Sequence, residues 1–162
     1  MIFVTVGSAT PFDRLTKTID RWAFQYGRRD VFAQIGRHAW KPQFISFSEM
    51  LAPCEFKCHV IAARVVIGHA GMGTILTALQ LTRPVLVMPR RGILGETRND
   101  HQLDTAKQLS GIDGIDVALD EESLFQKLCG IDEATGACAI SNHAEERLTT
   151  CIREFIHNGK NA

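Results

Sequence analysis

Short apolar runs alternate with helix-like segments along almost the whole chain, and this alternation limits the fold more than any other feature. Six runs have the length and the β-branched content of buried strands: residues 2–7, 31–36, 43–50, 65–68, 85–89 and 115–119. Strands that alternate with helices pair in parallel, because each crossover returns the chain to the same end of the sheet. The sequence therefore predicts an α/β fold, a Rossmann-like doubly wound parallel sheet covered by helices.

Apolar residues recur at helical spacing between most of these runs, which predicts helices with one buried face. The first helix is expected to bury Phe12, Leu15, Ile19, Trp22, Ala23 and Tyr26. Pro53 suits the first turn of a second helix, whose expected buried side is Phe56, Val60 and Ile61. Later helices are expected over residues 74–81 and 99–109, after an N-cap at Asp120, and from Asn142 to a final apolar stripe that includes Phe155 and Ile156.

Composition excludes several classes of protein. The 162 residues, 45% of them hydrophobic, are expected to form a single domain over residues 1–162. Lysine plus arginine and aspartate plus glutamate number 18 each, so no net charge favours nucleic acid as a partner. No apolar run reaches the roughly 20 residues of a membrane span, and the first residues lack a basic targeting region. We expect a cytoplasmic protein with free thiols.

A metal site is not expected. Cys54, Cys58 and His59 are close in sequence, but they follow a core-facing helical pattern and lack a second pair of ligands. The five cysteines also lack the spacing of a disulfide framework.

A glycine-rich turn follows the fourth apolar run. Gly68, Gly71 and Gly73 lead from this run into the helix expected at Thr74. Glycines at a helix start let backbone N–H groups approach a phosphate, and the helix dipole favours its negative charge. We therefore expect a nucleotide diphosphate here. The alternative is that the glycines serve only a tight turn and close packing.

Two familiar phosphate motifs fit this turn poorly. A Walker loop requires a lysine after its last glycine, whereas Thr74 follows Gly73, so ATP hydrolysis is disfavoured. A dinucleotide fingerprint follows the first strand, not the fourth. Arg90 and Arg91, just after the fifth run, are placed as an NADP phosphate contact would be, so an NADP-binding oxidoreductase remains an alternative.

A second polar cluster follows the first apolar run. Gly7 permits a tight turn, and the hydroxyls of Ser8 and Thr10 are placed to face a ligand. The alternative is a plain turn in which Thr10 caps a helix that begins at Pro11.

A third polar cluster begins the helix after the fifth run. It is the segment 96–102, which ends in Asn99, Asp100, His101 and Gln102. Amide and carboxylate side chains suit a sugar, because each sugar hydroxyl both donates and accepts hydrogen bonds. The alternative is a capped helix start in water.

Segments 2–15, 68–75 and 99–102, with a Pro-Val-Leu-Val-Met-Pro strand between the last two, resemble the family 28 glycosyltransferase C-terminal domain. The resemblance is strongest to the stand-alone donor-binding subunit of two-subunit UDP-sugar transferases of the dolichol-linked GlcNAc and bacterial exopolysaccharide types. It implies one Rossmann-like half of a two-lobed, GT-B type hexosyltransferase. A membrane-attached partner is expected to bind the lipid-linked acceptor, and the chain alone is expected to be inactive. A homo-oligomer of the isolated chain is compatible with this expectation. No cofactor besides the donor substrate is expected.

The resemblance also implies roles for individual residues. The expected nucleotide and phosphate contacts are Gly7, Ser8, Gly71, Met72, Gly73, Thr74 and Thr77. The expected sugar contacts are Asn99, Asp100, His101 and Gln102. His69 is expected to shape the cleft, with most catalytic groups supplied by the partner, although a purely structural histidine is an equal alternative. Uracil is expected near the end of the third strand, around residues 47–50.

One position departs from the family pattern. Related sequences commonly carry an acidic residue facing the ribose where this chain has Thr77. A hydroxyl replaces one hydrogen bond but not a charge-assisted pair. Arg90, Arg91 and Arg98 are expected either to compensate by facing phosphate or to be solvated loop residues. A noncatalytic nucleotide-sugar-binding scaffold therefore remains a further alternative.

Overall fold

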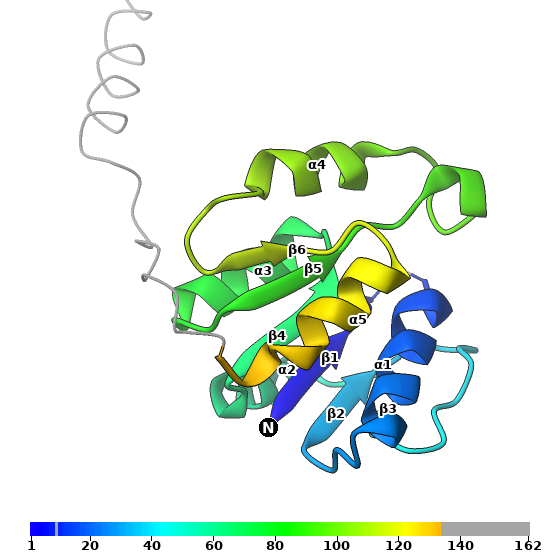
Figure 1. Ribbon diagram of the computed structural model, residues 1–162, viewed down its shortest axis with the longest axis vertical. Coiled ribbons are helices and arrows are strands. Elements are labelled where there is room, and N and C mark those ends of the chain that lie inside the picture. Colours follow the sequence, from blue (N-terminus) through cyan, green and yellow to red (C-terminus); the bar gives the residue numbers. More distant parts are fainter. Residues whose placement is uncertain (9, 134–162) are drawn as a thin grey trace, which may run out of the picture.

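A computed structural model describes residues 1–8 and 10–133, which form a six-stranded, fully parallel sheet with the order β3-β2-β1-β4-β5-β6 (Figure 1). The strands are β1 (Ile2–Thr5), β2 (Val31–Gln34), β3 (Ser46–Ser48), β4 (Val65–His69), β5 (Val85–Met88) and β6 (Ile115–Val117). All six expected strands are present, so the predicted doubly wound α/β fold is confirmed.

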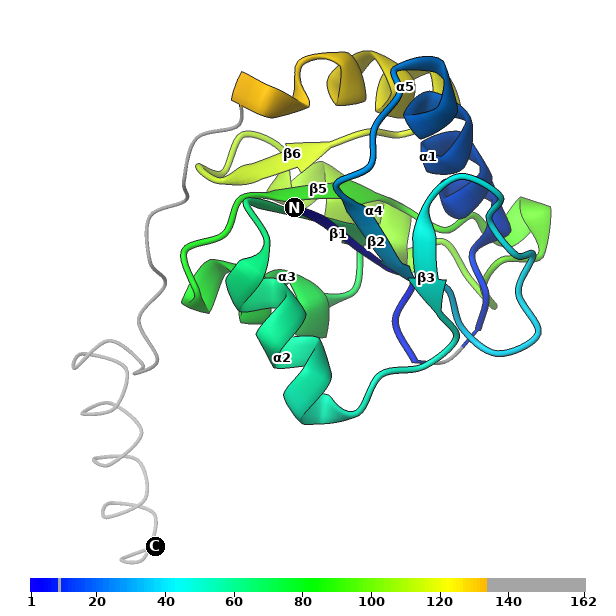
Figure 2. The ribbon, with the colours of Figure 1, turned by 90° about the horizontal axis from the view of Figure 1, so that it is seen from below.

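Helices cover both faces of the sheet (Figure 2). Helices α1 (Asp13–Gln25) and α5 (Glu121–Cys129) lie on one face, and α2 (Pro53–Ala62), α3 (Met72–Gln80) and α4 (His101–Leu109) lie on the other. Successive residues of β1 point to opposite faces: Ile2 and Val4 enter the core beneath α1 and α5, whereas Phe3 enters the other core. This two-sided burial explains why the strands are nearly continuous apolar runs.

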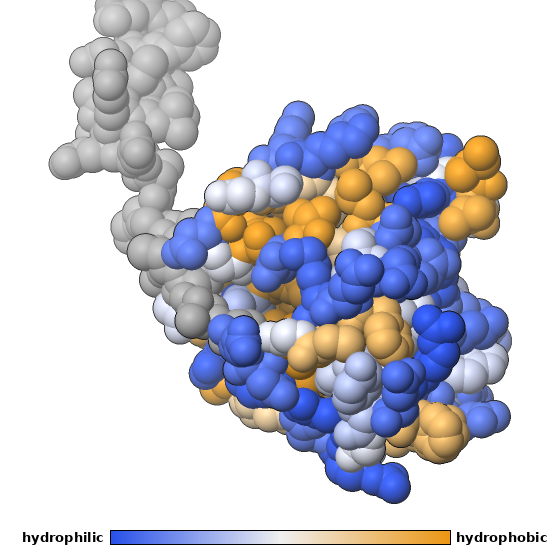
Figure 3. Space-filling model, in the orientation of Figure 1, coloured by the Kyte–Doolittle hydropathy of each residue, from blue (hydrophilic) through white to orange (hydrophobic). Residues whose placement is uncertain are grey.

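The outer surface over α1 and α5 is mainly hydrophilic, with separate hydrophobic areas (Figure 3). Helix α1 buries Leu15, Ile19 and Trp22 against the sheet, and Lys17 and Arg21 on its other side are exposed. The helical spacing in the sequence therefore identified the buried face of α1 correctly.

The third strand is shorter than expected. The sequence pattern predicts a strand over residues 43–50, but β3 covers only Ser46–Ser48. The backbone N–H groups of Gln43, Phe44 and Ile45 donate instead to the carboxylate of Asp20, at 3.2, 2.9 and 3.1 Å. Since these N–H groups already have an acceptor, the segment does not join the strand ladder.

Two residues expected in the core are exposed. Tyr26 follows the last residue of α1 and is 51% exposed, with its hydroxyl accepting from the Cys129 thiol at 3.3 Å. Ile61 is 47% exposed. The inward side of α2 is formed instead by Phe56, His59 and Val60, and the His59 ring stacks on Phe32 with centroids 4.2 Å apart. His59 is therefore a packing residue.

Helix ends follow the expected signals only in part. Asp120 caps α5 as expected, with its carboxylate accepting from Ser123 N at 2.8 Å. Helix α3 begins at Met72, two residues earlier than expected, and Phe12 occupies the N-cap of α1, so Thr10 is not its cap. The helix expected from Asn142 lies outside the described residues.

The strand order reverses between β1 and β4, whose carboxyl ends adjoin each other. In open parallel sheets this reversal leaves a crevice between the loops that follow the two strands, and ligands bind there. None of the helices in the described part of the chain is long and apolar enough to cross a bilayer.

We predict that Asp20→Ala lowers the free energy of unfolding by about 3 kcal/mol, because three backbone N–H groups lose a buried, charged acceptor at once. Urea denaturation measures this change. Asp113→Ala, in an exposed loop, is the matched control and is expected to change the free energy by less than about 0.5 kcal/mol. Equal effects of the two substitutions would contradict the role assigned to Asp20.

Candidate functional site

A cavity of about 870 Å³ opens at the carboxyl end of the sheet, between the loops after β1, β4 and β5. The β1–α1 loop and Gln34 at the end of β2 contribute Val6, Gly7, Ser8, Thr10 and Gln34. The segment before α2 contributes Met50 and Leu51, and the first turns of α2 contribute Pro53, Phe56 and Lys57. The remaining lining residues are His69, Gly71, Gly73, Thr74 and Thr77 after β4, and Arg90, Glu96, Thr97, Arg98 and Gln102 after β5.

The start of α3 presents backbone N–H groups to this cavity. Gly71 is the N-cap, with extended backbone angles, and its N–H donates to His69 O at 2.8 Å. The N–H groups of Met72 and Gly73 belong to the first turn and have no intrahelical acceptor. Of these two residues, Gly73 lines the cavity, whereas the Met72 side chain is exposed outside it. The free N–H groups and the helix dipole make this end of the cavity suited to an anion.

The imidazole of His69 lies against two glycines. A Cβ at Gly71 would lie 2.1 Å from His69 Nε2, and a Cβ at Gly7 would lie 2.6 Å from Cε1. Gly7 also has a φ of 80°, which other residues rarely adopt. Only glycine therefore lets the β1–α1 and β4–α3 loops pack against the same ring.

His69 is held in its neutral form. Burial lowers its pKa to about 4, and the positive charge of Arg90 acts in the same direction. Its Nδ1 atom is buried and has no hydrogen-bond partner among the described residues. At neutral pH the ring is thus an uncharged wall of the cavity.

Polar side chains fix the β1–α1 loop at its start. The Thr5 hydroxyl accepts from Gly7 N at 3.2 Å and donates to Gln34 Oε1 at 3.3 Å. Gln34 was not singled out from the sequence. Its signal was a single buried polar residue inside an otherwise apolar strand.

The four residues expected to contact a sugar are placed differently from one another. Gln102 is buried and lines the cavity, and its Oε1 accepts from Arg90 N at 3.2 Å. Asp100 accepts from Gly92 N at 2.7 Å, whereas Asn99 and His101 contact each other at the exposed start of α4. The last three do not line the cavity, but Thr97 and Arg98 from the same loop do.

Thr77, one turn after Gly73, lines the cavity as the sequence suggests for a residue near the ribose. Its hydroxyl donates to Gly73 O at 2.7 Å. The hydroxyl oxygen therefore retains only its acceptor capacity for a ligand.

Arg90 and Arg91 are neither the solvated nor the phosphate-facing residues that the sequence suggested. Arg90 is 4% exposed and donates to backbone carbonyl groups. Arg91 lies outside the cavity and donates to Leu119 O at 2.8 Å. Of the three, only Arg98 lines the cavity with a side chain that has no hydrogen-bond partner among the described residues.

No group of three or more histidine, cysteine or acidic residues in the described ranges is arranged to hold a metal ion. Cys54 and Cys58 are exposed free thiols. Among the residues that line the cavity, Glu96 is the single carboxylate, and it is paired with Arg14 at 2.7 Å.

We predict that the free energy of unfolding falls as the pH is lowered from about 6.5 to about 4, partly because of His69. Over this range the unfolded chain protonates His69 while the native protein keeps it neutral, so protons favour unfolding. Urea denaturation at pH 5 and pH 7 measures the effect. His69→Gln lacks this component and is expected to show a smaller loss at pH 5. An unchanged pH dependence would show that His69 has the same pKa in the native protein as in the unfolded chain.

The chain is similar to known glycosyltransferases. It is 30% identical over 118 residues to UDP-N-acetylglucosamine transferase subunit ALG13 of Homo sapiens, a match that covers 67% of this chain and 10% of that protein. The chain thus spans about a tenth of the length of this curated relative.

Solved structures show the same fold. The NMR solution structure of ALG13 matches with a TM-score of 0.62 at 18% identity, over 87% of this chain and 90% of that chain. The crystal structure of the glycotransferase of kitacinnamycin matches with a TM-score of 0.60 at 18% identity, over 80% of this chain and 34% of that chain. The Rossmann-like lobe of GT-B transferases is therefore the fold found here.

The sequence pattern of the "Glycosyltransferase family 28 C-terminal domain" matches residues 1–147. This range includes all the strands in the described part of the chain and every residue that lines the cavity. The resemblance found in the three sequence segments is confirmed, and the chain belongs to the glycosyltransferase family 28 C-terminal domain family.

Proposed function

We propose that this chain is the donor-binding half of a UDP-sugar glycosyltransferase, which transfers a hexose-type sugar to a lipid-linked acceptor in glycan or polysaccharide precursor synthesis. The observation that carries the proposal is the convergence of two glycine loops and the free N–H groups of α3 on one cavity, in a chain of this family. The similarity to a UDP-N-acetylglucosamine transferase subunit supports a UDP-sugar as the donor.

The diphosphate is assigned to the glycine end of the cavity. There the N–H groups of Met72 and Gly73 donate to its oxygens, and Thr74, Gly7 and Ser8 complete the contacts. As the anomeric bond breaks, negative charge develops on the leaving diphosphate. Backbone N–H groups already in place stabilise this charge without reorganising.

The nucleoside is assigned to the side formed by Gln34, Met50, Leu51 and Phe56, because this wall combines apolar surface with an amide. Thr77 accepts a hydrogen bond from a ribose hydroxyl. The sugar is assigned to the side of Gln102 and Thr97, where the Gln102 Nε2 group donates to none of the described residues. Asp100 acts indirectly, by holding Gly92 in the loop.

Activation of the acceptor hydroxyl requires a base, and the cavity offers none. Both Glu96 oxygens accept from Arg14, at 2.7 and 2.9 Å, and one also accepts from Arg91 N at 2.9 Å. Burial and the nearby positive charge keep the His69 pKa near 4, which makes it a weak base. We therefore assign the base and the acceptor site to a membrane-attached partner subunit, with this chain peripheral to the membrane and inactive alone.

The NADP-binding alternative is not favoured by the site. It required Arg90 and Arg91 to face a phosphate, but both donate to backbone carbonyl groups. A noncatalytic nucleotide-sugar scaffold uses the same donor site and differs only in the absence of transfer.

We predict that UDP and UDP-sugars raise the melting temperature of the chain, whereas NADPH does not, because a ligand that binds the native state stabilises it. Differential scanning fluorimetry with each ligand at a matched concentration measures this. Transfer assays with and without a candidate membrane partner then separate the enzyme subunit from a scaffold. Stabilisation by NADPH alone, or robust transfer by the isolated chain, would contradict the proposal.

We predict that Gly73→Val abolishes measurable UDP binding while the protein stays folded. A Cβ at Gly73 meets no atom within 4 Å, so the fold tolerates the side chain, but the residue lines the cavity and the added methyl groups occupy it. Gly95 also has open space around a Cβ but lies outside the cavity; since its φ is 69°, Gly95→Asn is the control. Isothermal titration calorimetry compares the two variants, and undiminished UDP affinity in Gly73→Val would exclude the assigned diphosphate site.

A further inference from the structure

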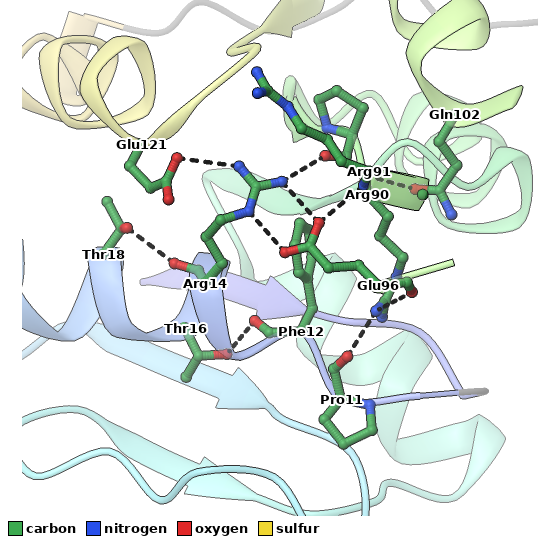
Figure 4. Close-up of polar contacts among 12 residues, drawn as sticks. Pro11, Phe12, Arg14, Thr16, Thr18, Arg90, Arg91, Glu96, Gln102 and Glu121 are labelled. Atoms are coloured by element: carbon green, nitrogen blue, oxygen red, sulfur yellow. Dashed lines mark hydrogen bonds and ion pairs between the residues drawn. The ribbon is translucent and has the colours of Figure 1, made fainter. Parts of the chain in front are cut away.

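Arg90 connects the loops that surround the cavity (Figure 4). It follows β5, and its side chain crosses to the β1–α1 loop. Its guanidinium donates four hydrogen bonds to backbone carbonyl oxygens: from Nη2 to Val6 at 2.8 Å and Thr10 at 2.7 Å, and from Nη1 to Pro11 at 2.6 Å and Glu96 at 3.4 Å. These bonds use the N–H groups of both terminal nitrogens.

Because Arg90 is buried, the four carbonyl oxygens must stay in position to accept its hydrogen bonds. A buried cation is tolerated only when its donors have acceptors in the right positions. Three of the four acceptors lie within residues 6–11, and the guanidinium also lies over the Phe12 ring, 4.6 Å from its centroid. The planar guanidinium therefore fixes the course of the β1–α1 loop.

The other end of this arrangement is also fixed. The Glu96 carboxylate accepts from Arg14 Nε at 2.7 Å and Nη2 at 2.9 Å, and Arg14 also donates to Pro89 O at 3.0 Å (Figure 4). The loop that follows β5 is thereby held against the start of α1. The backbone on either side of Arg90 is therefore fixed where the Arg90 side chain leaves it to contact the β1–α1 loop.

The β1–α1 loop carries Gly7, which lies against the His69 ring, and the same ring lies against Gly71 at the start of α3. A path of direct contacts thus runs from Arg90 through the β1–α1 loop and His69 to the N–H groups assigned to the diphosphate. Arg90 is a component of the cavity wall, but its terminal N–H groups are already bonded to the protein.

We propose that Arg90 is a positioning residue of the diphosphate site: its guanidinium holds the β1–α1 loop against the His69 ring, and this contact sets the position of the α3 N-terminus. The inference rests on the proposed function for its ligand, UDP. Arg90 contributes the fixed geometry of its planar guanidinium as well as its charge. A lysine amine cannot donate to all four carbonyl groups at once.

The test is Arg90→Lys, which keeps the positive charge and removes the guanidinium. Arg91→Lys is the matched control, since Arg91 is the next residue, lies outside the cavity and donates to Leu119 O. Two measurements are made on each purified chain: NMR titration of the His69 imidazole without ligand, and calorimetric titration with UDP. Circular dichroism confirms that each variant is folded.

In Arg90→Lys, we expect the His69 pKa to rise from about 4 toward its ordinary value of 6.5, because the relaxed loop exposes the ring to water. UDP affinity is expected to fall about tenfold, because misplaced N–H groups lose the binding free energy of roughly one well-aligned hydrogen bond. Arg91→Lys is expected to match the wild type in both measurements. Glu96→Gln weakens the ion pair with Arg14 and is expected to change the His69 pKa and the UDP affinity in the same directions, but by less. This variant replaces Arg90→Lys if Arg90→Lys does not fold.

Unchanged His69 titration and unchanged UDP affinity in Arg90→Lys would overturn the inference, because charge alone would then suffice. A changed His69 titration in a protein whose wild type does not bind UDP would support the positioning role of Arg90 and reject the proposed function instead. The ligand-free titration thus separates the two failures.

Discussion

The close approach of two glycine loops to one histidine ring is the constraint on which the rest of the site depends. Strand β1 pairs with β4, so the loops that follow them leave the sheet side by side. The His69 ring occupies the space between these loops, and a side chain at Gly7 or Gly71 would collide with it. The backbone can therefore come near a ligand at this edge, which side chains would otherwise prevent.

Buried and partly buried polar contacts hold the loops around the cavity. Arg90 donates to carbonyl groups of the β1–α1 loop, Glu96 accepts from Arg14 and Arg91 N, and Gln102 accepts from Arg90 N. Buried polar groups are costly when unpaired, so each of these pairs strongly disfavours alternative loop positions. Such a preorganised wall suits the stabilisation of a leaving diphosphate.

Much of the fold could be predicted from the sequence, since periodicity reports which residues face the core. Apolar runs identified all six strands, and helical spacing identified the buried face of α1. The exceptions have long-range causes: Asp20 takes the N–H groups of Gln43 to Ile45 away from β3. A carboxylate on α1 gives no local sign of which backbone groups will reach it.

The site was predictable where it depends on backbone and not where it depends on distant side chains. Glycines after β4 indicated a phosphate-binding turn, and Gly71, Gly73 and Thr74 do line the cavity. The buried position of Arg90 has no local sequence signal, because its acceptors lie some 80 positions away in the sequence. The sequence predicts a sugar contact equally for Asn99, Asp100, His101 and Gln102. Consecutive residues at a helix start point in different directions, however, and only Gln102 of the four lines the cavity.

The central claim is that backbone N–H groups at the start of α3 bind the diphosphate of a uridine nucleotide. Two-dimensional ¹H–¹⁵N NMR with increasing UDP tests it most directly, because each N–H group reports separately. The account predicts the largest shifts at residues 71–74 and at Gly7 and Ser8. Little change is expected at residues 111–114, which lie at the amino end of the sheet, away from the cavity. Shifts concentrated at residues 111–114, or no shifts with any uridine nucleotide, would contradict it.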